Sequence, residues 1–540
     1  MKRFYIYLIL GLILAAVVVA YLWLQPSQAE KVTVLRTQSK KYLVITRDRF
    51  VDGLAPWRAR RERQGFEVKF RSWSASPEVN DIERWIQQEI KKSHGQCRYI
   101  LLVGDCAGPG EEAADWHLPT FIGPTGYPYE KDKPLRPMES DAPFGDIDHD
   151  GQMEVAVGRL PVRNEAQLAI QLAKIVEHEE RPLVPSYYRA VLWTGAKDHH
   201  DPMYQTTLQY VENLLPDGLY PYVISSYPDS ACSGPLTEQP SQFLNAVAQP
   251  AFISMVVGHG DYNNLRCAEI NHEEIRMMVD SVAALPSTAA VGPLLLLACE
   301  AGTYNLPTAQ GPSMAEAFLN HPGGPVAVVA AAGNLNVLTN FYLAGSIAHN
   351  IQGRSTTIGD LLVDSRQILY KIGKYTLAQI RAHDPRTREL LGPPQEDNQD
   401  LYEIKNLLRN ESLLYNLLGD PCLALNLPKP LRVQMAMVGE HQLHISGIVP
   451  PEADHLWIEQ FDLNRLKVQA PPDATDEQRR QLFQEANQAP RLLANQLLKG
   501  PTWLAEITLT DEQMVYGSKI RVMAIGGTAA YAHTIAMPVQ

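Results

Sequence analysis

Two residues that can do covalent chemistry, a histidine and a cysteine, each follow a short apolar run. His259 lies between Gly258 and Gly260 directly after the run 252–257, and Cys299 directly follows the run 293–298. Short apolar runs bounded by Gly or Pro are typical of strands buried on both faces of a parallel sheet. If the two strands are neighbours, both residues leave the sheet at its carboxyl edge, which is where open α/β sheets place their ligand crevices.

A thiol and an imidazole at one sheet edge predict nucleophilic catalysis by cysteine. The thiolate is the attacking species, and a nearby imidazole takes the thiol proton or holds the thiolate as an ion pair. Either residue alone has an ordinary structural explanation, because buried cysteines are common and mostly inert. The pair, in matching strand-end positions, favours a cysteine peptidase with Cys299 as the nucleophile and His259 as the general base and acid.

An acidic loop supplies a second candidate site. Asp146, Asp148 and Asp150 alternate ahead of Gly151, and alternating carboxylates followed by glycine can bind a hard cation such as Ca²⁺. The twelfth position counted from Asp146 is Val157 rather than the glutamate of an EF-hand. A structural calcium ion is one expectation and a solvated turn is the other, because Asp and Gly are also common turn residues.

The elements expected to position these residues alternate between strands and helices. The predicted strands of the first two thirds of the chain lie at 42–45, 66–70, 99–103, 190–193, 222–225 and 324–331, in addition to the two runs above. The predicted helices lie at 49–64, 81–92, 164–180, 204–215, 269–279, 343–350 and 359–371. This alternation predicts a parallel, doubly wound sheet.

Beyond residue 428 the apolar pattern changes from helical spacing to alternation. Short strands are predicted at 432–438, 442–446, 456–461, 503–509, 519–525 and 530–537. A charged, glutamine-rich segment over 475–498 interrupts them, and it is expected to form a helical insertion capped at Thr475. The last part of the chain is therefore predicted to be an all-β sandwich.

Composition argues against a nucleic-acid partner and against a fold held together by zinc or disulfides. A chain of 540 residues with 45% hydrophobic and 20% charged residues is typical of a globular protein of two or three domains. The formal net charge of −12 argues against a nucleic-acid partner, because such surfaces are basic. The six cysteines show no CxxC spacing, which favours neither a zinc site nor a disulfide framework.

The N-terminal residues carry a topological signal. Lys2 and Arg3 precede an apolar stretch over residues 4–24, a length that suits a bilayer crossing of about 20 residues better than a signal-peptide core of about 7 to 15. Positive charge keeps that end in the cytoplasm. The expectation is an anchor in a bacterial inner membrane with the bulk of the chain in the periplasm. The small-residue triplet ending at Ala29 also permits a cleaved signal peptide and a secreted protein.

Four blocks of this sequence resemble those of the gingipain-type cysteine peptidases, a family of the caspase-like clan. They are Val257–Gly260, Leu297–Gly302, Val155–Val162 and Tyr415–Pro421, in the family's order, within a resemblance that spans residues 40–428. The resemblance implies a caspase-like parallel-sheet catalytic unit in two subdomains, followed by an immunoglobulin-like sandwich. The expected domains are the anchor or signal peptide, an N-terminal α/β subdomain, the catalytic subdomain and the sandwich with its helical insertion, at 1–29, 30–185, 186–428 and 429–540.

The resemblance also implies roles for individual residues. The backbone amides of Gly260 and Cys299 would form the oxyanion hole. The group that orients the histidine would lie on the loop after the strand 190–193, where Asp198 is the candidate. Members of the family often carry an acidic loop like the one over 146–151, which implies calcium there.

Substrate specificity is the part of the resemblance that does not carry over. In the arginine-directed members an aspartate lies a few residues beyond the orienting group, and Asp201 is the candidate in this chain. The aligned position lies nearer Met203 or Tyr204, so a preference for arginine is not implied. Glu300, directly after the thiol, is the second candidate for contacting the substrate.

Two other functions also fit the sequence. A catalytically inactive scaffold or binding protein with the caspase-like fold would explain the altered loop, and the negative charge of Glu300 beside Cys299 disfavours a thiolate. A transpeptidase or processing enzyme for exported proteins would use the same chemistry, because an amine can resolve an acyl-enzyme in place of water. In each case the expected partner is a polypeptide.

Overall fold

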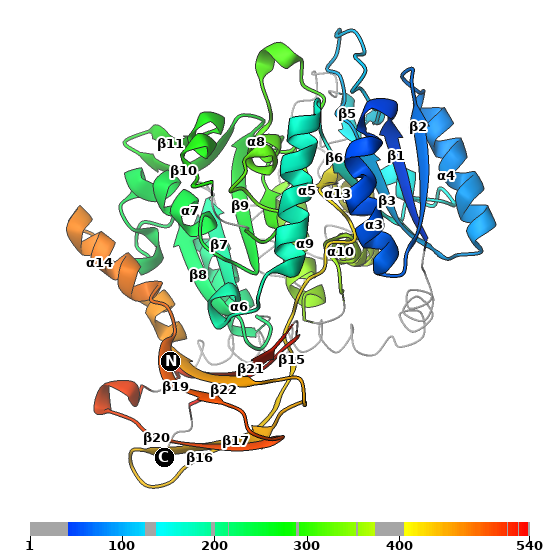
Figure 1. Cartoon of the computed structure of the whole chain (residues 1–540). Helices are drawn as coiled ribbons and strands as arrows, with labels where there is room; N and C mark the ends of the chain where they lie inside the picture. The colour runs from blue at the N-terminus through cyan, green and yellow to red at the C-terminus, as the bar shows by residue number, and fades with distance from the viewer. Residues whose placement is uncertain are drawn as a thin grey trace.

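The computed structural model describes residues 41–124, 137–195, 200–213, 215–287, 291–352, 355–372, 404–515, 517–527 and 529–537. Its largest feature is a 12-stranded, mostly parallel sheet with helices on both faces, and smaller sheets built from the end of the chain lie to one side of it (Figure 1). The expected α/β class, with a large parallel sheet, is confirmed. None of the helices in the described part of the chain is long and apolar enough to cross a bilayer; the expected anchor over 1–29 lies outside the described residues.

The first half of the large sheet is formed by residues 41–160. Its strands are β1 (Lys41–Arg47), β2 (Glu67–Trp73), β3 (Cys97–Val103) and β6 (Ala156–Leu160), joined in parallel in the order β6-β3-β1-β2. The helices are α3 (Ala55–Arg63), α4 (Val79–Ser93) and α5 (Glu165–Glu180). Every residue of β3 is buried, as expected for a central strand covered on both faces. A hairpin of β4 (Phe121–Pro124) and β5 (Pro137–Ser140) lies outside this sheet.

The second half of the sheet carries the two candidate strand ends. Its strands are β7 (Arg189–Gly195), β8 (Tyr220–Ser225), β9 (Ile253–Asp261), β12 (Leu294–Leu297), β13 (Val328–Ala331) and β14 (Tyr415–Leu418). The helices are α6 (His200–Asn213), α7 (Gln239–Val247), α8 (Met314–Asn320), α9 (Val337–Asn350), α10 (Ile358–Ile372) and α13 (Ile404–Ser412). β9 is central here, because it pairs in parallel with β7 on one side and with β12 on the other.

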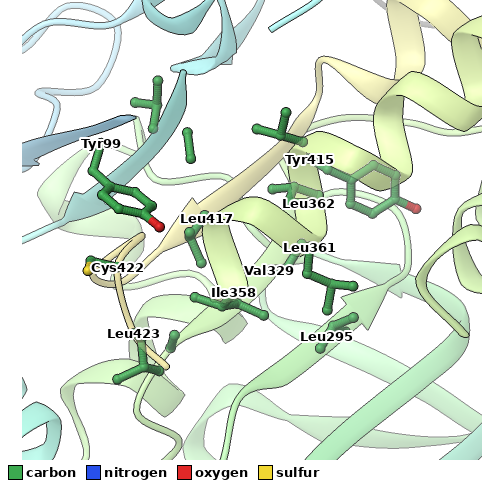
Figure 2. Packing of buried hydrophobic residues seen from close by; sticks show 14 of the residues in the cluster. Tyr99, Leu295, Val329, Ile358, Leu361, Leu362, Tyr415, Leu417, Cys422 and Leu423 are labelled. Atoms are coloured by element: carbon green, nitrogen blue, oxygen red, sulfur yellow. The ribbon is translucent and has the colours of Figure 1, made fainter. Parts of the chain in front are cut away.

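The two halves are one continuous sheet. β14 runs antiparallel to β13 and pairs with β6, so that it closes the gap between the halves. Figure 2 shows the core at this junction, where Leu417 of β14 lies among Val329, Ile358, Leu361 and Tyr99. A single hydrophobic cluster therefore spans both expected subdomains. Helix α5 adds a polar link, since the buried Lys174 donates to the backbone oxygen of Pro325 at 2.9 Å.

The helix predicted over 269–279 is wrong. These residues belong to an antiparallel hairpin of β10 (Asn264–Ile270) and β11 (Glu273–Met278) that extends the sheet beyond β9. The turn consists of Asn271 and His272, which have φ values of 50° and 69°, the positive values that a tight two-residue hairpin turn requires. Within the hairpin, Glu274 of the predicted helix forms an ion pair with Arg266 of the neighbouring strand at 3.4 Å.

The end of the chain forms two further sheets, of five and three strands, that share a hydrophobic core. Their strands are β15 (Lys429–Pro430), β16 (Arg432–Met437), β17 (Gln442–Ile448), β18 (His455–Phe461), β19 (Arg491–Leu497), β20 (Thr502–Thr508), β21 (Lys519–Gly526) and β22 (Ala529–Ala536). The predicted helix is α14 (Asp476–Ala486), and its cap at Thr475 is confirmed by a reciprocal capping box with Gln478. The helix ends earlier than predicted, because residues 491–497 pair with β18 as β19.

Candidate active site

The register between β9 and β12 brings the candidate dyad to one level of the sheet. Leu297 of β12 pairs with Val257 of β9 in a parallel ladder, and Cys299 and His259 each come two residues later. His259 lies within β9, which continues to Asp261, and Cys299 lies in the turn that follows β12. The two residues therefore lie at the same carboxyl edge of neighbouring strands, whose axes run about 4.8 Å apart. Both are half-buried.

Gly260 lies against the backbone of the cysteine. A Cβ atom added at this glycine would be 3.2 Å from the carbonyl oxygen of Cys299 and 3.1 Å from the Cβ of Ala298. Gly258 is tighter still, since its Cβ would meet the carbonyl oxygen of Gly195 in β7 at 2.8 Å. The two glycines that flank His259 thus allow three strand ends to approach closely around the imidazole and the thiol.

The thiol of Cys299 is held by the backbone of Leu335, in the segment between β13 and α9. The N–H of Leu335 donates to Sγ at 3.4 Å, and the thiol donates a hydrogen bond to the Leu335 carbonyl oxygen, with Sγ 3.7 Å from that oxygen. Burial raises the pKa of the Cys299 thiol, the Leu335 N–H lowers it, and the charges of Glu411 and Glu300 raise it further. The thiol therefore needs a base to become a nucleophile at neutral pH.

Cys299 differs from the other cysteines in its exposure. It is half-buried, whereas Cys97, Cys106, Cys232, Cys267 and Cys422 are buried, and all six are free thiols. Burial raises the pKa values of Cys106 and Cys267 to about 12. Cys299 is thus the cysteine that an external reagent or a polypeptide can reach most readily.

Glu300, a candidate substrate contact, occupies the sharp turn after the thiol. Its φ of 54° lies in the left-handed region, which a non-glycine residue adopts only at a cost of about 1 kcal/mol or more. The turn is fixed by hydrogen bonds from the Glu300 N–H to the Gly333 carbonyl at 3.0 Å and from the Thr303 N–H to the Glu300 carbonyl at 3.0 Å. This strained turn directs the chain after Cys299 back along β13.

The candidate orienting and specificity groups are only partly within the described structure. Asp198 lies outside the described residues, and Asp201 lies in α6 at a position whose side chain is not described. Their loop starts where β7 ends, at Gly195, which pairs with Gly258 one residue before the histidine. The loop therefore leaves the sheet at the edge that carries His259 and Cys299.

The acidic loop brings its three aspartates together, with a fourth carboxylate. Oxygen atoms of Asp146, Asp148, Asp150 and Glu154 all lie within 4.8 Å of one another. Burial, together with the three aspartate charges, raises the pKa of Glu154 to about 7. Asp146 Oδ1 is buried and accepts no hydrogen bond from the described residues. Four carboxylates with one unused buried oxygen suit the oxygen-rich coordination of calcium.

Two residues near the thiol had no signal in the sequence motifs. Leu335 contacts Sγ through its backbone, and Glu411 of α13 is a buried acid that affects the pKa of Cys299. A backbone contact does not depend on residue type, which is why no motif reveals Leu335. For Glu154 a signal did exist, because it is the ninth residue counted from Asp146 and the ninth position of an EF-hand loop also supplies a ligand.

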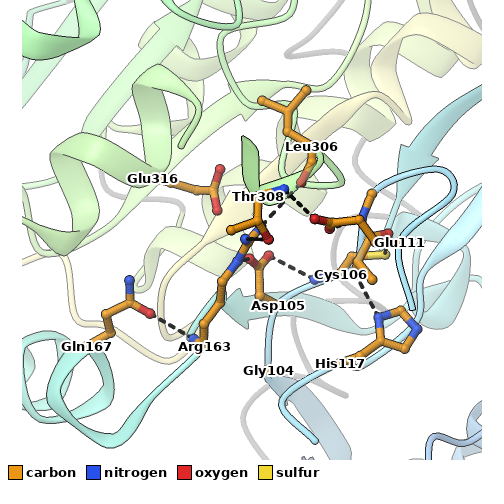
Figure 3. Close-up of polar contacts among 12 residues, drawn as sticks. Gly104, Asp105, Cys106, Glu111, His117, Arg163, Gln167, Leu306, Thr308 and Glu316 are labelled. Atoms are coloured by element: carbon orange, nitrogen blue, oxygen red, sulfur yellow. Dashed lines mark hydrogen bonds and ion pairs between the residues drawn. The ribbon is translucent and has the colours of Figure 1, made fainter. Parts of the chain in front are cut away.

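A second polar cluster lies at the carboxyl end of β3. Figure 3 shows Arg163 between Asp105 and the segment that contains Leu306 and Thr308. Arg163 Nε donates to Asp105 Oδ2 at 2.5 Å, and Nη1 donates to the Thr308 hydroxyl at 2.6 Å. Burial raises the pKa of the nearby Glu316 well above its usual value, and the charge of Asp105 raises it further. The cluster joins the two halves of the molecule through buried charges.

Comparison with solved structures finds the same fold. Gingipain R, an Arg-specific cysteine proteinase, matches with a TM-score of 0.52 and 14% identity, over 92% of this chain and 98% of that chain. A structure described as a protease matches with a TM-score of 0.54 and 13% identity, over 92% and 97% of the two chains. The complex of the pro- and mature domains of RgpB from Porphyromonas gingivalis matches with a TM-score of 0.49 and 14% identity, over 92% and 99%. A comparison with curated proteins found no match.

A family comparison covers most of the same residues. The model of peptidase family C25 matches residues 36–426, which include both strand ends and the four sequence blocks. The resemblance drawn from those blocks is thereby confirmed, and so is the expectation of a cysteine-type endopeptidase. The chain belongs to peptidase family C25, the gingipain family.

Proposed function

We propose that this chain hydrolyses peptide bonds through a Cys299–His259 dyad. The observation that carries the proposal is the parallel register of β9 and β12, which brings the two residues to the same sheet edge. Family membership supports a cysteine peptidase, and Cys299 is the least buried of the six thiols. In this account His259 takes the thiol proton, and the thiolate attacks the carbonyl carbon of the substrate.

The expected reaction has two halves. In the first, His259 returns its proton to the leaving amine as the carbon–nitrogen bond breaks, which leaves a thioester on Cys299. In the second, His259 removes a proton from water, the hydroxide attacks the thioester, and the thiol is regenerated with a free carboxylate product. The N–H groups of Gly260 and Cys299 are the proposed donors to the oxyanion, and the close approach of Gly260 to the Cys299 carbonyl supports their proximity.

The roles proposed for the other site residues rest on the sequence. Asp198 is proposed to orient the imidazole, because its loop leaves the sheet beside Gly258. Asp201 and Glu300 are proposed to contact the substrate. The substrate is a polypeptide. A preference for arginine is not part of the proposal, because the position aligned with the family's specificity aspartate lies nearer Met203 or Tyr204 than Asp201.

We also propose where the protein is located, which metal ion it binds and which fold its last domain has. The basic residues and apolar stretch at the start of the chain support an inner-membrane anchor with a periplasmic catalytic unit, or secretion after cleavage at Ala29. The four carboxylates around Asp146 support a structural calcium ion. The shared core of the two terminal sheets supports an immunoglobulin-like sandwich over 429–540.

Three variants test the dyad together. Cys299→Ala and His259→Ala are each expected to abolish peptide hydrolysis while the circular dichroism spectrum stays unchanged, and Cys267→Ala serves as a matched control because that thiol is buried. Hydrolysis by Cys299→Ala at the wild-type rate would reject the dyad. Normal biological activity of Cys299→Ala, without any peptide hydrolysis by the wild type, would favour the scaffold function. Transfer of the acyl group to an added amine, with little free carboxylate, would favour the transpeptidase function.

A further inference from the structure

The sulfur of Cys299 is hydrogen-bonded to a turn that lies outside the sequence motifs of the site. The backbone of Leu335 both donates to Sγ, at 3.4 Å, and offers its carbonyl oxygen to the thiol, at 3.7 Å. Leu335 belongs to the segment that leads from β13 into α9. A hydrogen bond from a backbone N–H stabilises a thiolate relative to a thiol. Any group that fixes this segment therefore affects the reactivity of Cys299.

One buried side chain fixes the segment from the far side. Glu411 Oε2 accepts hydrogen bonds from the backbone N–H of Asn336 at 2.8 Å and from the hydroxyl of Thr339 at 2.5 Å. Asn336 follows Leu335 directly, and its own side chain caps α9 by accepting from the Leu338 N–H. Glu411 is fully buried, and its second oxygen accepts no hydrogen bond from the described residues. The carboxyl group thus connects α13 to the turn beside the nucleophile.

The charges around Glu411 do not neutralise it. Cys299 and Tyr415 face it from the ends of β12 and β14, and the charge of Glu411 raises the pKa of each, after the larger effect of burial. Arg366 of α10 donates to the Ser412 and Tyr415 carbonyl oxygens rather than to Glu411. Arg409 lies in the same helix as Glu411, but its guanidinium packs against Gly151 of the acidic loop. Among the described residues Glu411 has no ion pair.

Toward the solvent side, two more charges act on the thiol. Glu300 raises the pKa of Cys299, and Arg266 of β10 lowers it. Both belong to the edge of the sheet, whereas Glu411 approaches from the protein interior. Burial raises the pKa of Glu411 to about 7, so this acid changes charge within the working range of many enzymes.

We propose that Glu411 is a positioning residue that holds the Leu335 turn against Cys299 and, through its charge, sets the pH range in which the thiol is reactive. The proposal rests on Cys299 being the nucleophile. Two effects of the carboxylate oppose each other. Its hydrogen bonds keep the Leu335 N–H on the sulfur, which favours the thiolate, and its negative charge disfavours the thiolate.

Two substitutions at residue 411 separate these effects. Glu411→Gln keeps an oxygen for Asn336 and Thr339 but has no charge, so the alkylation rate of Cys299 at pH 8 is expected to rise by about threefold to tenfold. Glu411→Ala removes the hydrogen bonds as well, so the turn loosens and the rate falls below that of the Gln variant. Glu316→Gln is the matched control, because Glu316 is an equally buried acid with its own capping contacts.

The measurement is the rate of iodoacetamide modification of the Cys299 peptide between pH 5 and 10, read by mass spectrometry. Because an imidazole also changes charge near neutral pH, the profiles are compared in a His259→Ala background. There the chain with Glu411 is expected to show a second inflection near neutral pH, besides that of the thiol itself, which Glu411→Gln lacks and Glu316→Gln retains. Thr339→Val provides a further test that keeps residue 411 intact: loss of the hydroxyl donor raises the pKa of Glu411 and moves the inflection to higher pH. Identical profiles with Glu411 and with Glu411→Gln in this background would overturn the proposal.

Peptide hydrolysis, measured on the same substitutions with His259 intact, distinguishes this proposal from the proposed function. If Cys299→Ala still hydrolyses peptide, the nucleophile assignment fails regardless of the alkylation profile. If hydrolysis depends on Cys299 and the alkylation profile is unchanged in Glu411→Gln, the dyad stands and the role of Glu411 fails. A lower kcat with unchanged KM in Glu411→Ala is expected, because the turn contacts the nucleophile.

Discussion

Gly260 lies so close to Cys299 that a Cβ atom at residue 260 would be 3.2 Å from the Cys299 carbonyl oxygen. This contact places the backbone after His259 against the backbone of the nucleophile. It is the arrangement in which two N–H groups from different strands can point at one developing oxyanion.

Gly260→Ala is expected to lower kcat/KM for peptide hydrolysis by about tenfold or more, because the added methyl group separates the two proposed oxyanion donors. The melting temperature should change little, since the contacts at 3.1 to 3.2 Å are tight without being impossible. Gly123→Ala is the control, because a Cβ there meets no atom within 4 Å. Unchanged kcat/KM in Gly260→Ala would remove Gly260 from the oxyanion site.

The stability of the fold should depend on the protonation of Glu411. Its pKa is raised to about 7 in the folded chain from the usual 4.5, so the stabilisation from the bound proton is fully present below pH 4.5 and is lost as the pH rises through 7. Burial of the charged form costs up to about 3 kcal/mol. Urea unfolding at pH 5 and pH 8 should show a smaller difference in free energy for Glu411→Gln than for wild type; equal differences would contradict this.

Calcium is expected to stabilise the chain through the acidic loop. Addition of Ca²⁺ to metal-free protein should raise the melting temperature by a few degrees, because a ligand that binds only the folded state stabilises it. Asp148→Asn should weaken this effect by removing one of the four clustered carboxylates. Asp473→Asn, at an exposed position outside the cluster, should retain it. A melting temperature that is insensitive to calcium in wild type would argue for a plain solvated turn.

The Asp105–Arg163 pair should be strongly coupled. Arg163→Met leaves the buried Asp105 without its guanidinium partner at 2.5 Å, and the loss is expected to be about 3 kcal/mol of unfolding free energy. The double variant Asp105→Asn with Arg163→Met should be more stable than Arg163→Met alone, because the uncompensated charge is gone. Additive losses in urea unfolding would show that the two residues act independently.

The sequence predicted the central sheet well because its strands carry local signals. Runs such as 99–103 and 294–297 are apolar throughout, and this pattern depends only on burial of both faces. The hairpin over 264–278 and strand β19 were missed because their charged and polar residues also fit a helical pattern, and strand pairing decides between the two: β10 pairs with β11 and β9, and β19 pairs with β18. Strand pairing is a tertiary interaction, and it overrides a local helical pattern.

The candidate site was predicted in the same uneven way. His259 and Cys299 could be recognised because strand ends converge at one edge of a parallel sheet. Leu335 and Glu411 could not, since they lie 36 and 112 residues beyond Cys299 and approach it only after β13 and β14 have paired. Contacts of this kind involve backbone atoms or buried acids, and neither has a fixed spacing in the sequence.

The central claim is that Cys299 is activated by His259. The most direct test is labelling of the intact protein with a thiol-directed peptidyl electrophile, followed by mass-spectrometric identification of the modified residue in wild type and in His259→Ala. The account predicts one adduct, on Cys299 in wild type, and a labelling rate reduced by about a hundredfold or more in the folded His259→Ala variant. Labelling of a different cysteine, or equal labelling of Cys299 with and without His259, would contradict it.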